Sequence, residues 1–185
     1  MPVMISMLRG INVGGHKIIR MDALRALYQS LGLEHAQSYV QSGNLVFRTQ
    51  DLDVPSLSTA IENAIERAFG FRPAVILRTL SEFREVVAGN PFATRPDISP
   101  SKLLVTFFAG DPGQEARDKL LRIKAHREEI RVARCELYIY FPDGMGRSKL
   151  PMTSIDRALN IPGTGRNWNS VLKLLAMAEG LETIP

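Results

Sequence analysis

The stretch Ser38-Tyr39-Val40-Gln41-Ser42-Gly43-Asn44-Leu45-Val46-Phe47-Arg48-Thr49 decides the fold class. Its central residues, Ser42-Gly43-Asn44, form a turn sequence between two segments rich in strand-forming residues. Such a turn between two strand-forming segments predicts a β-hairpin. The order of the other strands and helices can be assigned on either side of this predicted hairpin.

On either side of this hairpin the sequence alternates between strand and helix patterns. Residues 3–8 form an apolar run typical of a buried strand, and residues 22–31 have the apolar spacing of an amphipathic helix. After the hairpin, residues 55–70 predict a second helix that starts with proline, and residues 74–78 predict another strand. The predicted order over residues 1–79 is therefore βαββαβ.

The second half of the chain repeats part of this order. Residues 80–101 predict a capped helix and a proline-containing loop that connect the two halves. Beyond them we expect strands at 102–108, 130–134 and 137–141, and helices at 111–125, 154–159 and 167–178. We predict an α+β, duplicated ferredoxin-like fold in which the βαββαβ half, 1–79, is followed by a βαββα half with an additional C-terminal helix, 102–185. The halves form either two units or one compact domain.

The composition is that of a globular protein. The chain has 185 residues, with 45% apolar and 23% charged side chains, which excludes a disordered or fibrous chain. No stretch approaches the roughly 18 apolar residues of a membrane span, so we expect no membrane partner and a cytoplasmic location. The single cysteine, Cys135, excludes an internal disulfide and a cysteine-rich metal site.

The positive charge is concentrated in three segments. The net charge is +4, but residues 9–20, 144–150 and 163–169 contain six Lys and Arg and no Asp or Glu. The rest of the chain is slightly acidic. We expect the cations of the three segments to converge on one surface: Arg9, Lys17, Arg147, Lys149 and Arg166.

The first of these segments contains a glycine-rich loop after the first strand. Gly10 and Gly15 have the spacing of a phosphate-binding P-loop, but the lysine is displaced to Lys17 and the hydroxyl residue that binds magnesium is missing. The glycines also fail the dinucleotide fingerprint. Two interpretations therefore stay open: anion binding, and a wide turn that requires positive φ.

Four motifs give the sequence a family resemblance. Arranged along nearly the whole chain, LRGINVGG, YVQSGNLVF, GRSKL and TGRNWNSVLKL resemble the bacterial domain of unknown function 1697 family. The resemblance implies a ferredoxin-like duplication and assigns no activity. Gly165 stands where the family pattern would lead us to expect alanine. The motifs single out as candidate ligand-binding residues Arg9, Asn12, Gly14, Gly15, Lys17, Gln41, Ser42, Asn44, Arg147, Ser148, Lys149, Arg166 and Asn167.

The two C-terminal motifs suggest a second anion site. Thr164 is expected to cap the last helix, whose free N–H groups, together with Arg166, would face a phosphate or carboxylate. The alternative is that Arg166 and Asn167 hydrogen-bond loop backbone and tie the two halves together. Trp168 is expected in the core, on the face it shares with apolar residues of that helix. Tyr138 and Tyr140 share one strand face, and we expect them to pack rather than to stack on bases.

Catalytic patterns are weak in this sequence. The three histidines lack metal-ligand spacing, so no metal and no cofactor are expected. His16 is expected to be an exposed loop residue, and Ser42 or Ser148 would be nucleophiles only beside a base. We therefore expect a binding protein for a phosphate-bearing small molecule or nucleic acid. The alternatives are an enzyme that acts on a phosphorylated small molecule and a purely structural role for the loops.

Overall fold

The computed structural model describes residues 1–183, and within them the chain is α+β with two four-stranded antiparallel sheets and six α-helices. The first series of elements is β1 (Val3–Leu8), α1 (Met21–Ser30), β2 (Glu34–Tyr39), β3 (Asn44–Arg48), α2 (Val54–Phe69), β4 (Val75–Thr79) and α3 (Leu80–Ala88). The second is β5 (Leu103–Phe108), α4 (Gly113–Leu121), β6 (Glu129–Ala133), β7 (Glu136–Tyr140), α5 (Met152–Leu159), β8 (Gly163–Asn167) and α6 (Trp168–Glu182). Two short 3-10 turns lie at Pro100–Lys102 and Met145–Arg147.

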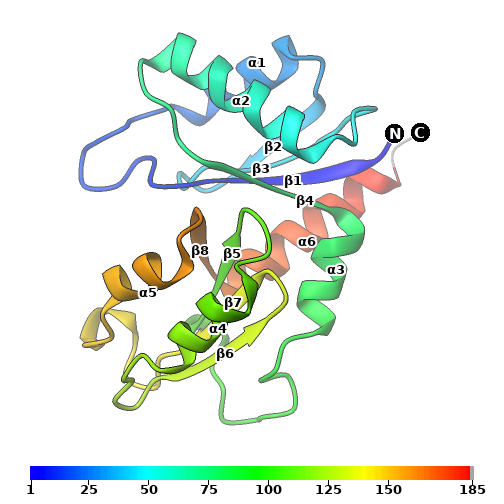
Figure 1. Ribbon diagram of the computed structural model, residues 1–185. Helices are drawn as coiled ribbons and strands as arrows, with labels where there is room; N and C mark the ends of the chain where they lie inside the picture. The colour runs from blue at the N-terminus through cyan, green and yellow to red at the C-terminus, as the bar shows by residue number, and fades with distance from the viewer. Residues whose placement is uncertain (184–185) are drawn as a thin grey trace. The chain divides into compact units, whose positions relative to one another are not determined.

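The first sheet has the order β2-β3-β1-β4, with β1 central and antiparallel to both of its neighbours. Helices α1 and α2 lie together on one face of it (Figure 1). Leu24 and Tyr28 of α1 pack with Ile61 of α2 against Met4 and Phe47 of the sheet, in one buried apolar cluster. The βαββαβ order predicted for this half is confirmed.

The second sheet has the order β6-β7-β5-β8. Its apolar cluster joins strand residues such as Leu137 and Ile139 to Leu120 of α4 and Ile155 of α5. The sequence prediction of three strands for this half was wrong, because the segment predicted to be a loop forms the fourth strand, β8. The observed order is therefore βαββαβ, followed by α6.

Strand β8 was missed because its glycines resemble turn residues. They have a packing reason instead: a Cβ atom at Gly163 would lie 3.2 Å from the Thr106 side chain, and one at Gly165 would lie 3.3 Å from the Leu104 side chain. Glycine in a strand commonly marks such a close approach. Ladder pairing with central strand β5 stabilises a segment that has little strand propensity of its own.

The two sheets repeat the same pairing register. Arg78 of β4 pairs with Ile5 of β1, and Arg166 of β8 pairs with Val105 of β5. Both arginines are buried. The fourth strand of each sheet thus carries a buried arginine at the equivalent position.

Each fourth strand also runs directly into a helix. Thr79 and Glu82 form the predicted capping box at the start of α3, with Thr79 N donating to Glu82 Oε2 at 2.8 Å and Glu82 N donating to Thr79 Oγ1 at 3.2 Å. At α6 the cap is Asn167, whose Oδ1 accepts from Asn169 N at 3.0 Å. The predicted cap, Thr164, lies inside β8 instead.

The chain divides into two compact units. One contains Met1–Glu85 together with the chain from Lys173 onward, and the other contains Val86–Leu172. In the first unit, Arg84 of α3 forms ion pairs with Glu179 at 3.1 Å and Glu182 at 2.7 Å, which hold the end of α6 to α3. The division therefore falls within α3 and α6, whereas we expected a first half at 1–79, a connection at 80–101 and a second half at 102–185.

Candidate functional site

The connection from β1 to α1, residues 9–20, forms a short hairpin that projects from the end of the first sheet (Figure 1). Asn12 N donates to Lys17 O and His16 N donates to Val13 O, both at 3.1 Å. Gly14 and Gly15 lie between the bridged residues Val13 and His16, and their φ angles are +59° and +78°. Positive φ at both central positions is the requirement of a type I′ hairpin turn. We call residues 12–17 the glycine hairpin.

The side chain of Asn12 braces the hairpin. Its Nδ2 donates to Ile19 O at 3.0 Å and to Gln41 O at 2.7 Å, and its Oδ1 accepts from Ile19 N at 2.8 Å. Asn12 itself has φ of +55°, a conformation that asparagine tolerates better than most residues. The candidate residues Asn12 and Gln41 are therefore brought together by a hydrogen bond from the Asn12 side chain to the Gln41 backbone.

The β2–β3 turn is fitted closely to the base of this connection. Leu8 N donates to Gly43 O at 2.9 Å, and Gly43 has φ of +73°. A Cβ atom at Gly43 would lie 2.8 Å from both Leu8 and Ile11 side-chain atoms, so only glycine fits. Asn44 is fully buried and donates to Ser42 Oγ at 2.8 Å. Ser42 and Asn44 are therefore parts of the turn rather than exposed ligand contacts.

The tip of the hairpin keeps its polar groups available. Within the described residues the N–H groups of Gly14 and Gly15 donate no hydrogen bond, and the side chains of His16 and Lys17 form no ion pair. All four residues are exposed. Arg20, by contrast, pairs with Asp22 at 2.7 Å and holds the pKa of that carboxyl below its usual range.

The second basic loop connects β7 to α5. Ser148 Oγ donates a hydrogen bond to Glu128 Oε1 and accepts one from Leu150 N at 3.0 Å. The sequence did not indicate Glu128, which lies twenty positions earlier and on no motif. Arg147 and Lys149 are exposed and form no ion pair among residues 1–183.

Glu128 is a poor general base for Ser148. The Ser148 hydrogen bond and the backbone N–H groups of His126 and Arg127 stabilise its carboxylate and lower its pKa. A lowered pKa weakens the group as a proton acceptor near neutral pH. Ser148 and Glu128 therefore form a hydrogen-bonded brace for this loop.

Arg166 is a buried structural residue of the second unit. It is 7% exposed, and its Nη1 donates to Thr164 Oγ1 at 2.7 Å and to Gly165 O at 2.8 Å. Burial lowers the pKa of its guanidinium to about 10. Our expectation that all five candidate cations share one surface was therefore wrong for Arg166.

The neighbouring candidates of the last motif also have backbone partners. Asn167 Nδ2 donates to Ser101 O at 2.8 Å, in addition to its cap at α6. Trp168 is 8% exposed, as predicted for a core residue. Tyr138 and Tyr140 are buried and donate to backbone carbonyls of Val86 and Asp97, so packing is confirmed for both.

The two basic loops are extra chain relative to the shared topology. Residues 9–20 join β1 to α1, whereas residues 109–112 make the equivalent connection from β5 to α4. Residues 141–151 join β7 to α5, whereas residues 49–53 make the equivalent connection from β3 to α2. These two enlarged connections, one in each unit, carry motif residues that are exposed and cationic.

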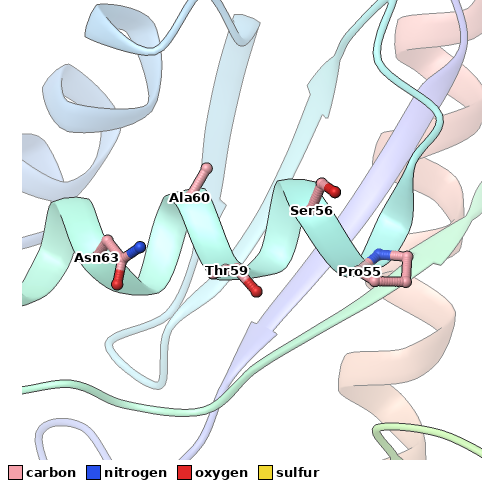
Figure 2. Close-up of a pocket in the computed structure, with 5 residues that line it drawn as sticks. All are labelled: Pro55, Ser56, Thr59, Ala60 and Asn63. Atoms are coloured by element: carbon pink, nitrogen blue, oxygen red, sulfur yellow. The ribbon is translucent and has the colours of Figure 1, made fainter.

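A surface hollow of about 410 Å³ lies along α2. Pro55, Ser56, Thr59, Ala60 and Asn63 line it, and all five belong to this one helix (Figure 2). It contains no charged side chain and no candidate residue. We therefore do not assign the site to it.

Two features are absent from residues 1–183, the described part of the chain. No helix among them has the length and apolar character needed to cross a membrane. In the same residues, no group of three or more His, Cys, Asp or Glu side chains is placed to hold a metal ion.

Comparison with known proteins bears on fold and family. No curated protein matches this chain. Among solved structures, a conserved bacterial protein from Streptococcus pneumoniae superposes with a TM-score of 0.76 over 96% of this chain and 98% of its own, at 21% sequence identity. The family model described as "Protein of unknown function (DUF1697)" matches residues 1–138, which include the glycine hairpin, the β2–β3 turn and strands β1 and β5. The chain belongs to the DUF1697 family.

Proposed function

We propose that the protein binds phosphate groups of a nucleotide or nucleic acid through the glycine hairpin. The observation that carries this proposal is the difference between the two units at one step of the same topology. The second unit passes from β5 to α4 in residues 109–112, but the first uses residues 9–20 for β1 to α1. A hairpin that the topology does not require, braced and exposed, is suited to binding.

The chemistry of the tip supports an anionic ligand. Two adjacent N–H groups, those of Gly14 and Gly15, make no hydrogen bond among the described residues, and successive backbone N–H groups form anion-binding concavities. Lys17 adds a charge that no carboxylate neutralises within residues 1–183, and His16 adds a ring that can donate. Between residues 9 and 20 there is no acidic side chain to repel a phosphate.

Arg147 and Lys149 are proposed as phosphate contacts of the second unit. They are exposed on the braced loop between β7 and α5, and within residues 1–183 neither has an acidic partner. For other candidates a structural role is favoured by specific contacts: Asn12, Asn44, Arg166 and Asn167 are held by hydrogen bonds to backbone or neighbouring side chains. Binding is preferred to catalysis because the serine–carboxylate pair of this loop has a weakened base.

We further infer that the two units are a duplicated ferredoxin-like fold in a cytoplasmic protein. Each sheet follows the βαββαβ order with the first strand central, which is the ferredoxin-like arrangement. The equivalent arginines, Arg78 and Arg166, and the helix caps that follow them support duplication. The lone Cys135 suits a reducing compartment.

Fluorescence anisotropy of labelled oligonucleotides, with competition by ATP and inorganic phosphate, tests the proposed binding. Lys17→Ala is expected to weaken binding about tenfold, as loss of one charge-assisted contact predicts. Lys173→Ala is the matched control, because Lys173 is an exposed lysine on α6 and its removal changes the net charge equally. Equal weakening by both variants, or no binding of any phosphate compound at low salt, would contradict the proposal.

A further inference from the structure

We propose that the polymer recognised by the glycine hairpin is B-form duplex DNA, entered at the major groove. This inference rests on the phosphate binding proposed above and names its ligand class. It comes from three properties of the hairpin: its narrow bridged backbone, its bracing and its lack of Phe, Tyr and Trp side chains.

The shape of the hairpin fits a groove. The backbone bonds Asn12 N to Lys17 O and His16 N to Val13 O close the hairpin around one antiparallel bridge, between Val13 and His16. Bridged backbones lie about 4.8 Å apart, and the major groove of B-form DNA, about 12 Å wide, admits a backbone hairpin of this width, since it admits a two-stranded ribbon. The corresponding groove of A-form RNA is too narrow and deep for side chains to read.

The bracing of the hairpin lowers the cost of inserting it. The three hydrogen bonds of the Asn12 side chain fix the base of the hairpin to Ile19 and to the Gln41 carbonyl. At Gly43 the β2–β3 turn packs closely against the Ile11 side chain. A ligand therefore meets a preformed hairpin and orders little new chain on binding.

The exposed side chains suit a duplex better than a single strand. Single-strand binding sites rely mainly on large aromatic residues for base stacking, and residues 9–20 and 40–43 contain no Phe, Tyr or Trp, with His16 as their one aromatic ring. Val13 and Ile18 are instead 67% and 59% exposed. Aliphatic side chains at this position can contact thymine methyl groups in the major groove, while Lys17 and the glycine N–H groups face phosphates.

The test compares four labelled probes of the same sequence with the full-length protein: duplex DNA, duplex RNA and each single DNA strand. Vesicles of phosphatidylserine and phosphatidylcholine form a fifth arm. The expected result is binding of duplex DNA about tenfold tighter than of the other nucleic acids. Equal affinity for duplex and single strands, or preference for RNA or vesicles, overturns the inference and leaves phosphate binding in place. Failure of every probe contradicts the proposed function itself.

Variants at the two hairpin glycines test whether the preference for duplex DNA depends on the shape of the hairpin or only on its charge. Gly14→Val combined with Gly15→Val opens the turn, because branched residues disfavour positive φ, even though a Cβ atom at either position would meet no other atom within 4 Å. This variant is expected to lose the preference for duplex DNA and to keep the weak, Lys17-dependent binding of single strands. Gly14→Asn is the control, since Asn-Gly forms the same turn type and preserves the preference. A duplex preference that survives the double valine variant overturns the inference.

Discussion

Asn12 Nδ2 donates a 2.7 Å hydrogen bond to the carbonyl oxygen of Gln41, which joins the first two sequence motifs within one unit. The two motifs are therefore linked in the structure, because the β2–β3 turn supplies the acceptor that holds the glycine hairpin in place. The residues that build this joint differ from the residues that remain available to a ligand.

Asn12→Ala is expected to lower the free energy of unfolding by about 1–3 kcal/mol, because Ile19 N–H and two carbonyl groups lose their partner. Asn12→Gly loses the same bonds but adopts positive φ without strain. It should be more stable than the alanine variant by about 1 kcal/mol. Urea unfolding of both variants measures this, and an alanine variant as stable as the wild type would refute the bracing role.

Arg166→Ala and Arg147→Ala should differ sharply in stability. Truncation of buried Arg166 removes its hydrogen bonds to Thr164 Oγ1 and Gly165 O and should cost about 1–3 kcal/mol. Truncation of exposed Arg147 should change stability by at most about 0.5 kcal/mol. The urea midpoints of the two variants test the assignment, which fails if Arg147→Ala is the more destabilised of the two.

Stability is expected to fall as the pH rises above 10. Burial raises the pKa of Tyr28, whose hydroxyl lies 2.8 Å from Ser6 Oγ in the first core. The folded state keeps this proton while the unfolded state releases it near pH 10, so the stabilisation is present below that pH and is lost above it. Tyr28→Phe should flatten the alkaline part of the stability curve, measured by urea unfolding from pH 8 to 11. An unchanged slope would contradict the linkage.

Ser148 and Glu128 should behave as a coupled pair. Ser148→Ala and Glu128→Gln each remove a charge-assisted hydrogen bond, and the double variant should lose less than the sum of the two. A coupling energy of about 0.5–3 kcal/mol is expected from a double-mutant cycle of urea unfolding. Strict additivity would show that the bond does not stabilise the loop.

The order of elements in the first unit could be predicted because its signals are local, although the second strand, expected at 38–41, spans Glu34–Tyr39. Apolar periodicity, the Ser42-Gly43-Asn44 turn and the Thr79–Glu82 capping box each specify structure within a few residues. Strand β8 could not, because its stability comes from pairing with β5, about sixty residues earlier in the sequence, and its glycines are required by Leu104 and Thr106 side chains. Pairing with a distant strand produces no recognisable pattern in the sequence of the paired segment itself.

The candidate site was only partly predictable for a related reason. The motifs single out candidate residues, but a motif residue that satisfies backbone groups and one that faces solvent look alike in sequence. Asn12 and Arg166 belong to the first kind, and Lys17 and Arg147 to the second. The Gly14-Gly15 pair did carry a usable signal, since two adjacent glycines favour a type I′ hairpin over a wide loop.

The most direct test of the account is the salt dependence of duplex DNA binding by the wild type, Lys17→Ala and Lys173→Ala. Each phosphate contact contributes about −0.9 to the slope of log affinity against log salt concentration. The Lys17→Ala slope should be shallower by about 1 than that of the wild type, and the Lys173→Ala slope should equal that of the wild type. Identical slopes for all three proteins would contradict phosphate binding by the glycine hairpin.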